Sequence, residues 1–351
     1  MKSKNNNIEW IDILRACAML GVIIIHISTP ILKMSFGKNM QYWWIGNIVD
    51  SAVRFSVPMF LMLSGATMLG REYPLKEYFI KRMFRVLFPF LFWMAVYLVF
   101  DWATLVPKRQ PHGFNRILHW GTDLFLNAGI SKHFWYIYMI LFIYLFVPFI
   151  GKWIRKLSRS SILYVSIGWI VLTVCCKSVP LNLYTWKEDL FSKFLAYFLF
   201  SGYLVLGYYL SKLSGSSRIR LFASLLFILS VLSSSVLTYI FSKSAHKLDL
   251  SMYGYLAWNT IIQSISLFLW VKDSGITNRF LSTVQHTISD YSYGIYLVHV
   301  MVIDILFNYG VFWKMAYPLI SLPLLAVLIL IISFSIIFIL RKIPFGNYIS
   351  G

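Results

Sequence analysis

The chain has 351 residues, of which 59% are hydrophobic, 18% aromatic and only 13% charged, whereas a water-soluble domain averages about 45–50% apolar and about 25% charged residues. This composition excludes a soluble globular enzyme, a disordered chain and a nucleic-acid-binding module. The cysteines, Cys17, Cys175 and Cys176, all lie in apolar runs, which excludes a disulfide scaffold.

Long, continuous apolar runs predict membrane-spanning helices rather than the short alternating strands of a β-barrel. Each run is close to the roughly 20 residues that cross a bilayer core. We therefore expect an all-α, polytopic integral membrane bundle of about ten transmembrane helices, with 1–351 as a single membrane domain and about 10–340 as its spanning region. The predicted spans are 10–31, 45–69, 86–106, 133–152, 161–179, 193–211, 221–242, 253–271, 289–310 and 316–340.

The distribution of Lys and Arg predicts the orientation of these spans. If the N-terminus is cytoplasmic, the inside segments hold 18 of these residues and the outside segments 12, with Arg15 and Arg54 inside spans. This bias predicts that both termini are cytoplasmic. It also explains much of the net charge of +19 through contact with anionic lipid.

The first span carries Asp12, Arg15 and His26, and charges inside a bilayer are costly. Asp12 and Arg15 are three residues apart and can pair on one face. Arg15 and His26 are eleven residues apart, about three turns, so His26 projects from the same face roughly 16 Å deeper, near the bilayer midplane. In the structural alternative, Arg15 reaches lipid phosphate and His26 bonds a neighbouring helix. For the two together we favour a functional role.

The second span carries Asp50 and Arg54, four residues apart, which can neutralise each other on one helix face. The predicted orientation places this pair in the outer leaflet. A structural ion pair and a role in shaping a substrate cavity are equally open.

A basic cluster, Lys81, Arg82 and Arg85, precedes the third span on the predicted cytoplasmic side. These cations can bind nucleotide phosphates. Simple membrane anchoring by the positive-inside rule explains most such clusters and stays open.

His133 and Trp135 open the fourth span on the predicted outer side, where an interfacial aromatic belt is the ordinary explanation. His112 and His119 lie in the preceding loop without the spacing or cysteine partners of a metal site, so we expect no metal.

The ninth span carries Ser289, Ser292, Tyr296 and His299. His299 lies about ten residues from the inner end, near the midplane, and Tyr296 is on the same face. Two midplane histidines, His26 and His299, can line one cavity. A histidine that only satisfies helix packing is the slightly favoured alternative for His299.

Several short motifs follow one another along the chain in an order that resembles acyltransferase family 3, a family of membrane O-acyltransferases. The match is to its stand-alone members, which lack a fused SGNH esterase-like domain. The motifs are Arg15 with His26 after ten residues; Pro58-Met59-Phe60-Leu61-Met62-Leu63-Ser64-Gly65; Lys81-Arg82 with Arg85 and Pro89; His133-Phe134-Trp135-Tyr136; and Ser292-Tyr293-Gly294-Ile295-Tyr296-Leu297-Val298-His299.

The resemblance implies a ten-helix bundle of the bacterial plasma (inner) membrane. It implies transfer of an acyl group, usually acetyl, from cytoplasmic acyl-CoA (acetyl-CoA as co-substrate) to a hydroxyl of an extracytoplasmic or lipid-linked glycan. Without a fused domain, a lipid-linked or membrane-proximal sugar acceptor fits better than a distant polymer. The expected partners are thus acyl-CoA, the sugar acceptor and membrane lipids.

Residue types suit this chemistry. A neutral imidazole can take a proton from a hydroxyl near pH 7, which makes His26 the expected base. Arg15, Arg82 and Arg85 can hold the phosphates of the donor, and Tyr296 or His299 can donate to the developing oxyanion. On the acceptor side we expect Asp50, Arg54, His133 and Trp135.

A transporter or flippase for a surface glycan or its lipid-linked precursor is the main alternative, because ten helices with polar midplane residues also suit transport. Inverted repeats would favour it, and none is visible in the sequence. A scaffold protein of the membrane is a third possibility, which the same-face Arg15 and His26 disfavour.

Overall fold

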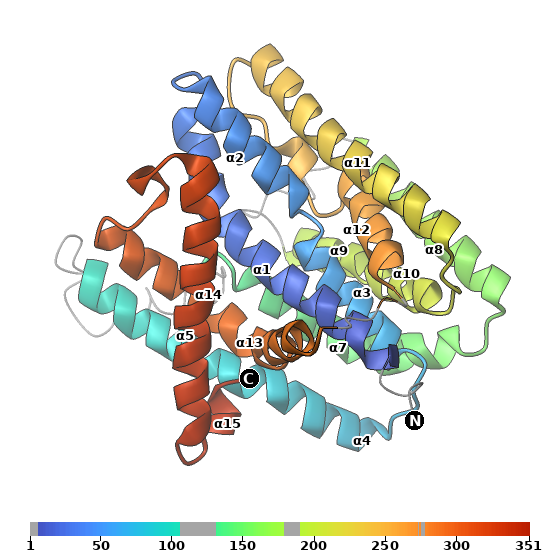
Figure 1. The fold of residues 1–351 in the computed structure, drawn as a ribbon. Helices are drawn as coiled ribbons and strands as arrows, with labels where there is room; N and C mark the ends of the chain where they lie inside the picture. The colour runs from blue at the N-terminus through green and yellow to red at the C-terminus, as the bar shows by residue number, and fades with distance from the viewer. Residues whose placement is uncertain (1–5, 106–130, 179–189, 273, 275–277) are drawn as a thin grey trace.

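The computed structural model describes residues 6–105, 131–178, 190–272, 274 and 278–351. Within these ranges the regular structure is entirely helical, and nine helices or helix pairs are long and apolar enough to cross a membrane. The chain is thus a polytopic helical membrane bundle, as its composition predicts (Figure 1). The elements are α1 (Asn6–Ser35), α2 (Met40–Ala52), α3 (Ser56–Met68), α4 (Leu75–Tyr78), η1 (Phe79–Met83), α5 (Phe84–Leu105), α7 (Trp135–Ile154), α8 (Arg159–Ser178), α9 (Leu190–Phe200), α10 (Gly202–Ser211), α11 (Ser217–Ser244), η3 (Ser251–Tyr253), α12 (Trp258–Val271), α13 (Arg279–Asn308), η4 (Trp313–Met315), α14 (Pro318–Lys342) and α15 (Gly346–Ile349).

Helix α1 lies in the middle of the bundle and packs against α2, α3, α13 and α14. Its contacts with α13 fix the relative direction of the two helices. Arg15 donates to Ser289, and the ring of His26 lies against that of His299. Since residue numbers rise together along both helices, α1 and α13 run parallel, as expected for the first and ninth spans of an alternating bundle.

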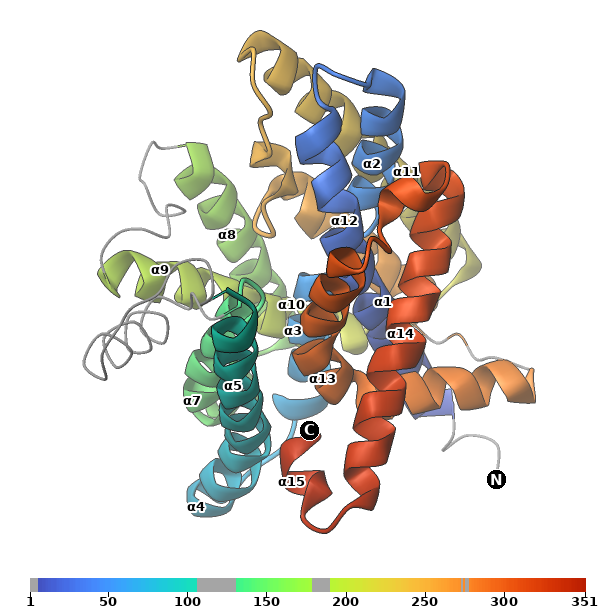
Figure 2. The ribbon, with the colours of Figure 1, turned by 90° about the vertical axis from the view of Figure 1, so that its left-hand side faces the viewer.

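Helix α13 starts ten residues before its predicted span 289–310. Figure 2 shows its first turns lying across the bundle, at an angle to the later turns that rise beside α14. Ser289, in the first half of α13, lies against the start of α1, where it bonds Asp12 and Arg15.

The predicted span 253–271 forms only the 14-residue helix α12, too short to cross a bilayer core on its own. The chain before it, from Ala245 to Ala257, is irregular apart from η3. Polar side chains satisfy its main-chain groups: Ser242 Oγ accepts from the Asp249 amide, and Tyr203 donates to the Tyr255 carbonyl. Such bonding allows irregular backbone to be buried among helices at membrane depth.

The predicted span 45–69 is interrupted between α2 and α3, at Val53–Phe55. The break places Arg54 beside Asp50, which is fully buried and forms an ion pair with it. Asp50 Oδ2 also accepts hydrogen bonds from Ser28 and Thr29 of α1, over 3.0 and 2.9 Å. The pair thus joins α2 to α1 at Ser28 and Thr29, which follow His26 by two and three residues.

Helices α3 and α10 pack with their backbones in contact, as small residues allow in membrane bundles. A Cβ on Gly65 would lie 1.9 Å from the carbonyl oxygen of Leu204, and one on Gly207 would lie 2.1 Å from that of Met62. Any larger side chain at either glycine would force the two helices apart.

The third predicted span, 86–106, begins earlier than expected. Residues 75–105 form one continuous helical run through α4, η1 and α5, in which η1 is a π-helical turn. Such wider turns are frequent at functional sites because they change where side chains point. Arg82 lies within this turn and Arg85 just after it.

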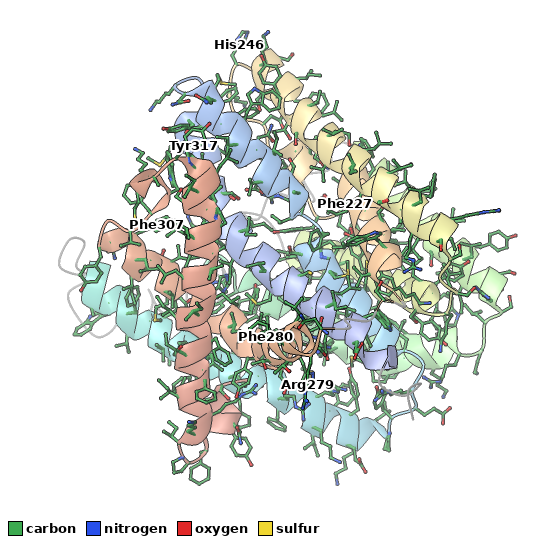
Figure 3. The ribbon with its side chains drawn as sticks, viewed as in Figure 1. Phe227, His246, Arg279, Phe280, Phe307 and Tyr317 are labelled. Atoms are coloured by element: carbon green, nitrogen blue, oxygen red, sulfur yellow. The ribbon has the colours of Figure 1, made fainter. Side chains whose placement is uncertain are left out.

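Large apolar side chains remain exposed on the outside of the bundle, which is the surface expected to face lipid. Figure 3 shows side chains projecting along the outer faces of α11 and α14. Examples that are more than half exposed are Leu221, Phe222, Leu225, Leu319, Ile320 and Leu324.

The buried ion pair gives a stability prediction. Asp50→Asn leaves Arg54 buried without its counter-charge, so we expect the free energy of unfolding to fall by about 3–5 kcal/mol. Thermal unfolding in detergent measures the loss. The double variant Asp50→Asn/Arg54→Met should recover much of the stability, because it removes both charges.

Glu77→Gln is the matched control, because Glu77 and Lys81 form an ion pair with the same spacing while both are well exposed. Exposed pairs contribute about 1 kcal/mol or less. Equal losses in Asp50→Asn and Glu77→Gln would show that burial of the first pair has no energetic weight.

Candidate functional site

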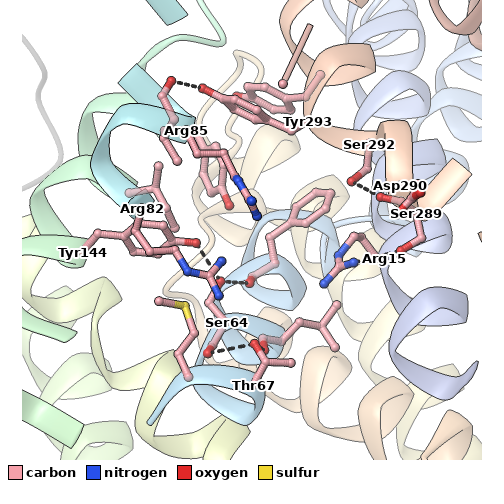
Figure 4. A pocket seen from close by; sticks show the side chains of 18 of the residues that line it. Arg15, Ser64, Thr67, Arg82, Arg85, Tyr144, Ser289, Asp290, Ser292 and Tyr293 are labelled. Atoms are coloured by element: carbon pink, nitrogen blue, oxygen red, sulfur yellow. Dashed lines mark hydrogen bonds between the residues drawn. The ribbon is translucent and has the colours of Figure 1, made fainter. Parts of the chain in front are cut away.

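A cavity of about 530 Å³ lies at the end of the bundle where α1 begins and α14 ends (Figure 4). The cationic side chains lining it are all arginines, at positions 15, 82, 85 and 341, and Asp290 carries the one lining side-chain carboxylate among the described residues. Figure 4 shows the guanidinium groups of Arg15, Arg82 and Arg85 pointing into the cavity from different helices. The charge of the lining therefore suits an anionic ligand.

Arg82 and Arg85 reach the cavity from η1 and α5, and the wall beside them is polar. Ser64 of α3 lies with its hydroxyl 3.3 Å from the hydroxyl of Tyr144 on α7, and both residues line the cavity. Hydroxyl groups next to guanidinium groups offer neutral hydrogen bonds to the same ligand that the cations attract.

Arg15 is held by a network that joins α1 to α13. Its Nη1 donates to Ser289 Oγ over 2.9 Å and lies 3.8 Å from the Asp12 carboxylate. Ser289 donates to Asp12 Oδ1 over 2.6 Å, and His286 Nδ1 lies 2.8 Å from Asp12 Oδ2. The expected Asp12–Arg15 pair is thus present, but the shorter bonds of Asp12 go to α13. Arg15 is oriented by this network while its guanidinium still faces the cavity.

Two buried tyrosines, Tyr136 and Tyr296, line the cavity at the end that lies within the bundle. They are 8% and 5% exposed, and their ring centroids are 5.3 Å apart. The hydroxyl of Tyr296 donates to the carbonyl of His133 over 2.5 Å, on the side away from the arginines. We call these two side chains the tyrosine floor.

Three histidines meet directly behind the tyrosine floor. The ring centroid of His299 lies 5.1 Å from that of His26 and 5.2 Å from that of His133, and His26 and His133 are 6.3 Å apart. We call these residues the histidine cluster. The sequence predicts that His26 and His299 lie near each other, and the structure brings them together. It also adds His133, which the sequence places on the acceptor side.

A hydrogen bond defines which nitrogen of His299 carries the hydrogen, whereas the partner of His133 is a hydroxyl that can donate or accept. His299 Nδ1 lies 2.6 Å from the carbonyl oxygen of Tyr296, and because a carbonyl only accepts, Nδ1 carries the hydrogen. Nε2 of a neutral His299 is then a proton acceptor. His133 Nδ1 lies 2.7 Å from Ser131 Oγ. Nε2 of both rings is buried and has no hydrogen-bond partner among the described residues.

In the described part of the chain, no three or more His, Cys, Asp or Glu side chains are arranged to hold a metal ion. His112 and His119 lie outside the described residues. What the histidine cluster offers chemically is proton acceptance and hydrogen bonding.

Three of the four expected acceptor-side residues form a separate group. The guanidinium of Arg54, paired with Asp50, lies 4.2 Å from the ring centroid of Tyr253 and 6.0 Å from that of Tyr255. Trp135 stacks on Tyr255 with centroids 5.6 Å apart and planes at 24°. Tyr255, carried by the irregular segment before α12, thus connects Trp135 to the buried ion pair.

Sequence reasoning missed other members of the site. Tyr144 carries no local signal, because it is one of many aromatic residues in its span. Arg341 is indistinguishable in sequence from the basic residues that end other spans. His286 could have been found, since it precedes Ser289 by three residues and so shares its helix face.

Comparison with known proteins agrees with this architecture. The chain matches a family model described as an acyltransferase domain over residues 8–342. No curated protein and no solved structure gives a significant match. The matched region takes in the arginine-lined cavity down to Arg341, the tyrosine floor and the histidine cluster. Because the family model covers nearly the whole chain, this protein belongs to acyltransferase family 3 and is a membrane acyltransferase.

Proposed function

We propose that this protein moves an acyl group, acetyl in the first instance, from acyl-CoA to a hydroxyl of an extracytoplasmic or lipid-linked glycan. The proposal rests on the order of three groups of side chains from one end of the bundle into its interior. The arginine-lined cavity comes first, the tyrosine floor next and the histidine cluster last. This order suits a donor with an anionic head and a reactive far end. A transporter has no comparable need for a cationic pocket that ends at a group of bases.

The cavity is the proposed donor site. Coenzyme A carries a diphosphate and a 3′-phosphate at one end and its thiol at the other. Guanidinium groups bind phosphates through paired, charge-assisted hydrogen bonds. Arg82 and Arg85 would hold the phosphates, Arg15 would bind deeper along the donor, and the thioester would reach the tyrosine floor.

His26 is the proposed general base. Its imidazole takes the proton of the acceptor hydroxyl while the hydroxyl oxygen attacks the thioester carbonyl carbon. The new C–O bond forms, the C–S bond breaks, and the thiolate of coenzyme A leaves and takes up the proton from His26. The transfer is therefore balanced without a metal or an oxidant.

Of the two residues expected to stabilise the oxyanion, Tyr296 fits the geometry better. A phenol hydroxyl can turn from the His133 carbonyl to a developing negative charge. A neutral His299 bonded through Nδ1 to the Tyr296 carbonyl has only an acceptor at Nε2. We therefore assign His299 to orienting His26, whose ring it contacts.

The acceptor would approach from the opposite end of the bundle. Asp50 and Arg54, with Trp135 beyond Tyr255, lie in the half of the protein away from the arginine cavity and next to α1 beyond His26. Aromatic and charged side chains are the groups that bind sugar rings and their lipid-linked phosphates. His133, next to His26, would meet the acceptor hydroxyl.

Transfer of this kind requires the cavity to face the cytoplasm, where acyl-CoA is made, in a bacterial plasma membrane with both termini inside. The excess of Lys and Arg in the predicted inside segments supports this orientation.

Orientation can be tested by cysteine labelling, with the three native cysteines replaced by alanine. Lys247→Cys, in the segment after α11, should react with a membrane-impermeant maleimide in intact cells. Ser214→Cys, in the segment before α11, should react only after the cells are broken. Both positions are exposed, so the opposite pattern would reverse the proposed orientation.

Donor binding can be tested at Arg82 and Arg85. Arg82→Ala and Arg85→Ala should each weaken acetyl-CoA binding by about tenfold or more, as expected for a charge-assisted hydrogen bond. The difference from the wild type should narrow at high salt, because screening weakens the ionic contact. Equilibrium binding to purified protein measures both effects.

Arg159→Ala is the control for that experiment, because Arg159 is exposed at the start of α8 and does not line the cavity. Unchanged affinity in the combined Arg82→Ala/Arg85→Ala variant would remove both residues from the donor site.

His26→Gln tests the base. Glutamine keeps much of the packing and hydrogen bonding but cannot take the proton, so glycan acylation should fall by about 10²–10⁴-fold. Acyl transfer and consumption of acetyl-CoA are measured together with the melting temperature. His246→Asn is the control, since His246 is exposed at the far end of the bundle (Figure 3).

Near-normal acylation by His26→Gln, with only a lower melting temperature, would contradict the assignment of His26 as base. A wild-type protein that consumes no acetyl-CoA but moves lipid-linked sugar across vesicles would support the transporter instead.

A further inference from the structure

Beyond the arginines that the sequence singles out, the cavity contains a fourth, Arg341, at the end of α14. In the sequence, Arg341 is only one of the basic residues of the predicted cytoplasmic segments. The chain after it, Ile343–Gly351, turns back towards the bundle, and we call this segment the hook. Asn347 and Gly351 of the hook line the cavity together with Arg341.

The hook is seated against α5 and α13. Phe345 adopts a left-handed conformation with φ of 62°, which reverses the chain into α15. Trp93 Nε1 donates to the carbonyl of Ile349 over 3.1 Å. A Cβ on Gly294 would lie only 2.2 Å from the carbonyl oxygen of Ser350, so the hook approaches α13 to backbone contact. Figure 2 shows α15 between α14 and α5, and α15 contacts both.

Arg341 is fixed in place by this arrangement. Its Nη2 donates to the main-chain oxygens of Asp290 and Gly351, over 3.0 and 2.7 Å. Its guanidinium carbon lies 3.8 Å from the ring centroid of Tyr291. A guanidinium has five N–H donors, so donors on Nε and Nη1 remain for a ligand after Nη2 has bound Asp290 of α13 and Gly351 of the hook.

The charge balance of the cavity favours such a ligand. Among the described residues, Arg341 brings the lining arginines to four, against one lining side-chain carboxylate, that of Asp290, and the main-chain oxygen of Gly351 that Arg341 already binds. Arg82 and Arg85 come from η1 and α5, whereas Arg341 comes from α14, so the cations are supplied from separate elements around one space. Several guanidinium groups around one cavity suit a ligand with more than one phosphate.

We propose that Arg341, held by the hook, is a further donor-binding residue that contacts the nucleotide phosphates of acyl-CoA, and that the hook forms a wall of the nucleotide subsite. This inference rests on the proposed function, because it assumes that the cavity takes acyl-CoA.

Lys342 provides a matched comparison. It follows Arg341 directly and is also cationic, but it is exposed, does not line the cavity and lies with its ammonium 4.3 Å from the ring centroid of Phe338. If the cations at this helix end only anchor the protein in the membrane, the two residues should behave alike.

The experiment compares two donors, acetyl-CoA and acetyl-pantetheine, which lacks the nucleotide and its phosphates. Arg341→Ala should lower kcat/KM for acetyl-CoA by about tenfold or more, and leave kcat/KM for acetyl-pantetheine close to the wild-type value. Lys342→Ala should change neither. Arg341→Lys, which keeps the charge but loses the planar fork, should lie between wild type and Arg341→Ala.

Melting temperature is measured for every variant. If Arg341→Ala does not fold, Arg341→Lys and Asn347→Ala take its place, with the same expectation of a loss confined to acetyl-CoA. If Arg341→Ala lowers kcat/KM equally for both donors, the hook is a purely structural element. If kcat/KM for acetyl-CoA is unchanged, Arg341 is not part of the donor site. Either result overturns the inference. A wild-type protein that uses neither donor contradicts the proposed function instead, so the two failures are distinguishable.

Discussion

The site depends on the packing of α1 against α13. These helices are parallel, so two positions along α1 each meet a residue of α13: Arg15 meets Ser289, and His26 meets His299. Residues 274 positions apart in the sequence, Arg15 and Ser289, thus meet at the cationic end, and the same pair of helices supplies the imidazole end. A change of register by one turn, about 5.4 Å, would separate both pairs at once.

Burial of charge in an apolar environment explains the irregular parts of the fold. Arg54 is tolerated because Asp50 pairs with it and the ring of Tyr253 covers it, as expected for ionisable groups at membrane depth. These contacts require a break between α2 and α3 and a non-helical segment before α12. Both interruptions lie in the half of the bundle proposed for the acceptor. A continuous helix there would offer an acceptor only its side chains, because its main-chain groups bond one another.

The tyrosine floor lies between the arginine cavity and the histidine cluster. Tyr296 contacts both, because its ring lines the arginine cavity while its hydroxyl bonds the carbonyl of His133. If donor and acceptor approach from opposite sides of the membrane, as we propose, this partition prevents an open passage that would leak ions and water.

The sequence by itself determined the membrane class, the positions of most spans, and the pairing of Asp12 with Arg15 and of Asp50 with Arg54. Each of these follows from hydropathy or from helical spacing within one segment. The tertiary structure alone decided that His133 joins His26 and His299, that α12 is short, and that Arg341 lies in the cavity. These features depend on contacts between segments far apart in the chain, and helical periodicity carries no information about which helices become neighbours.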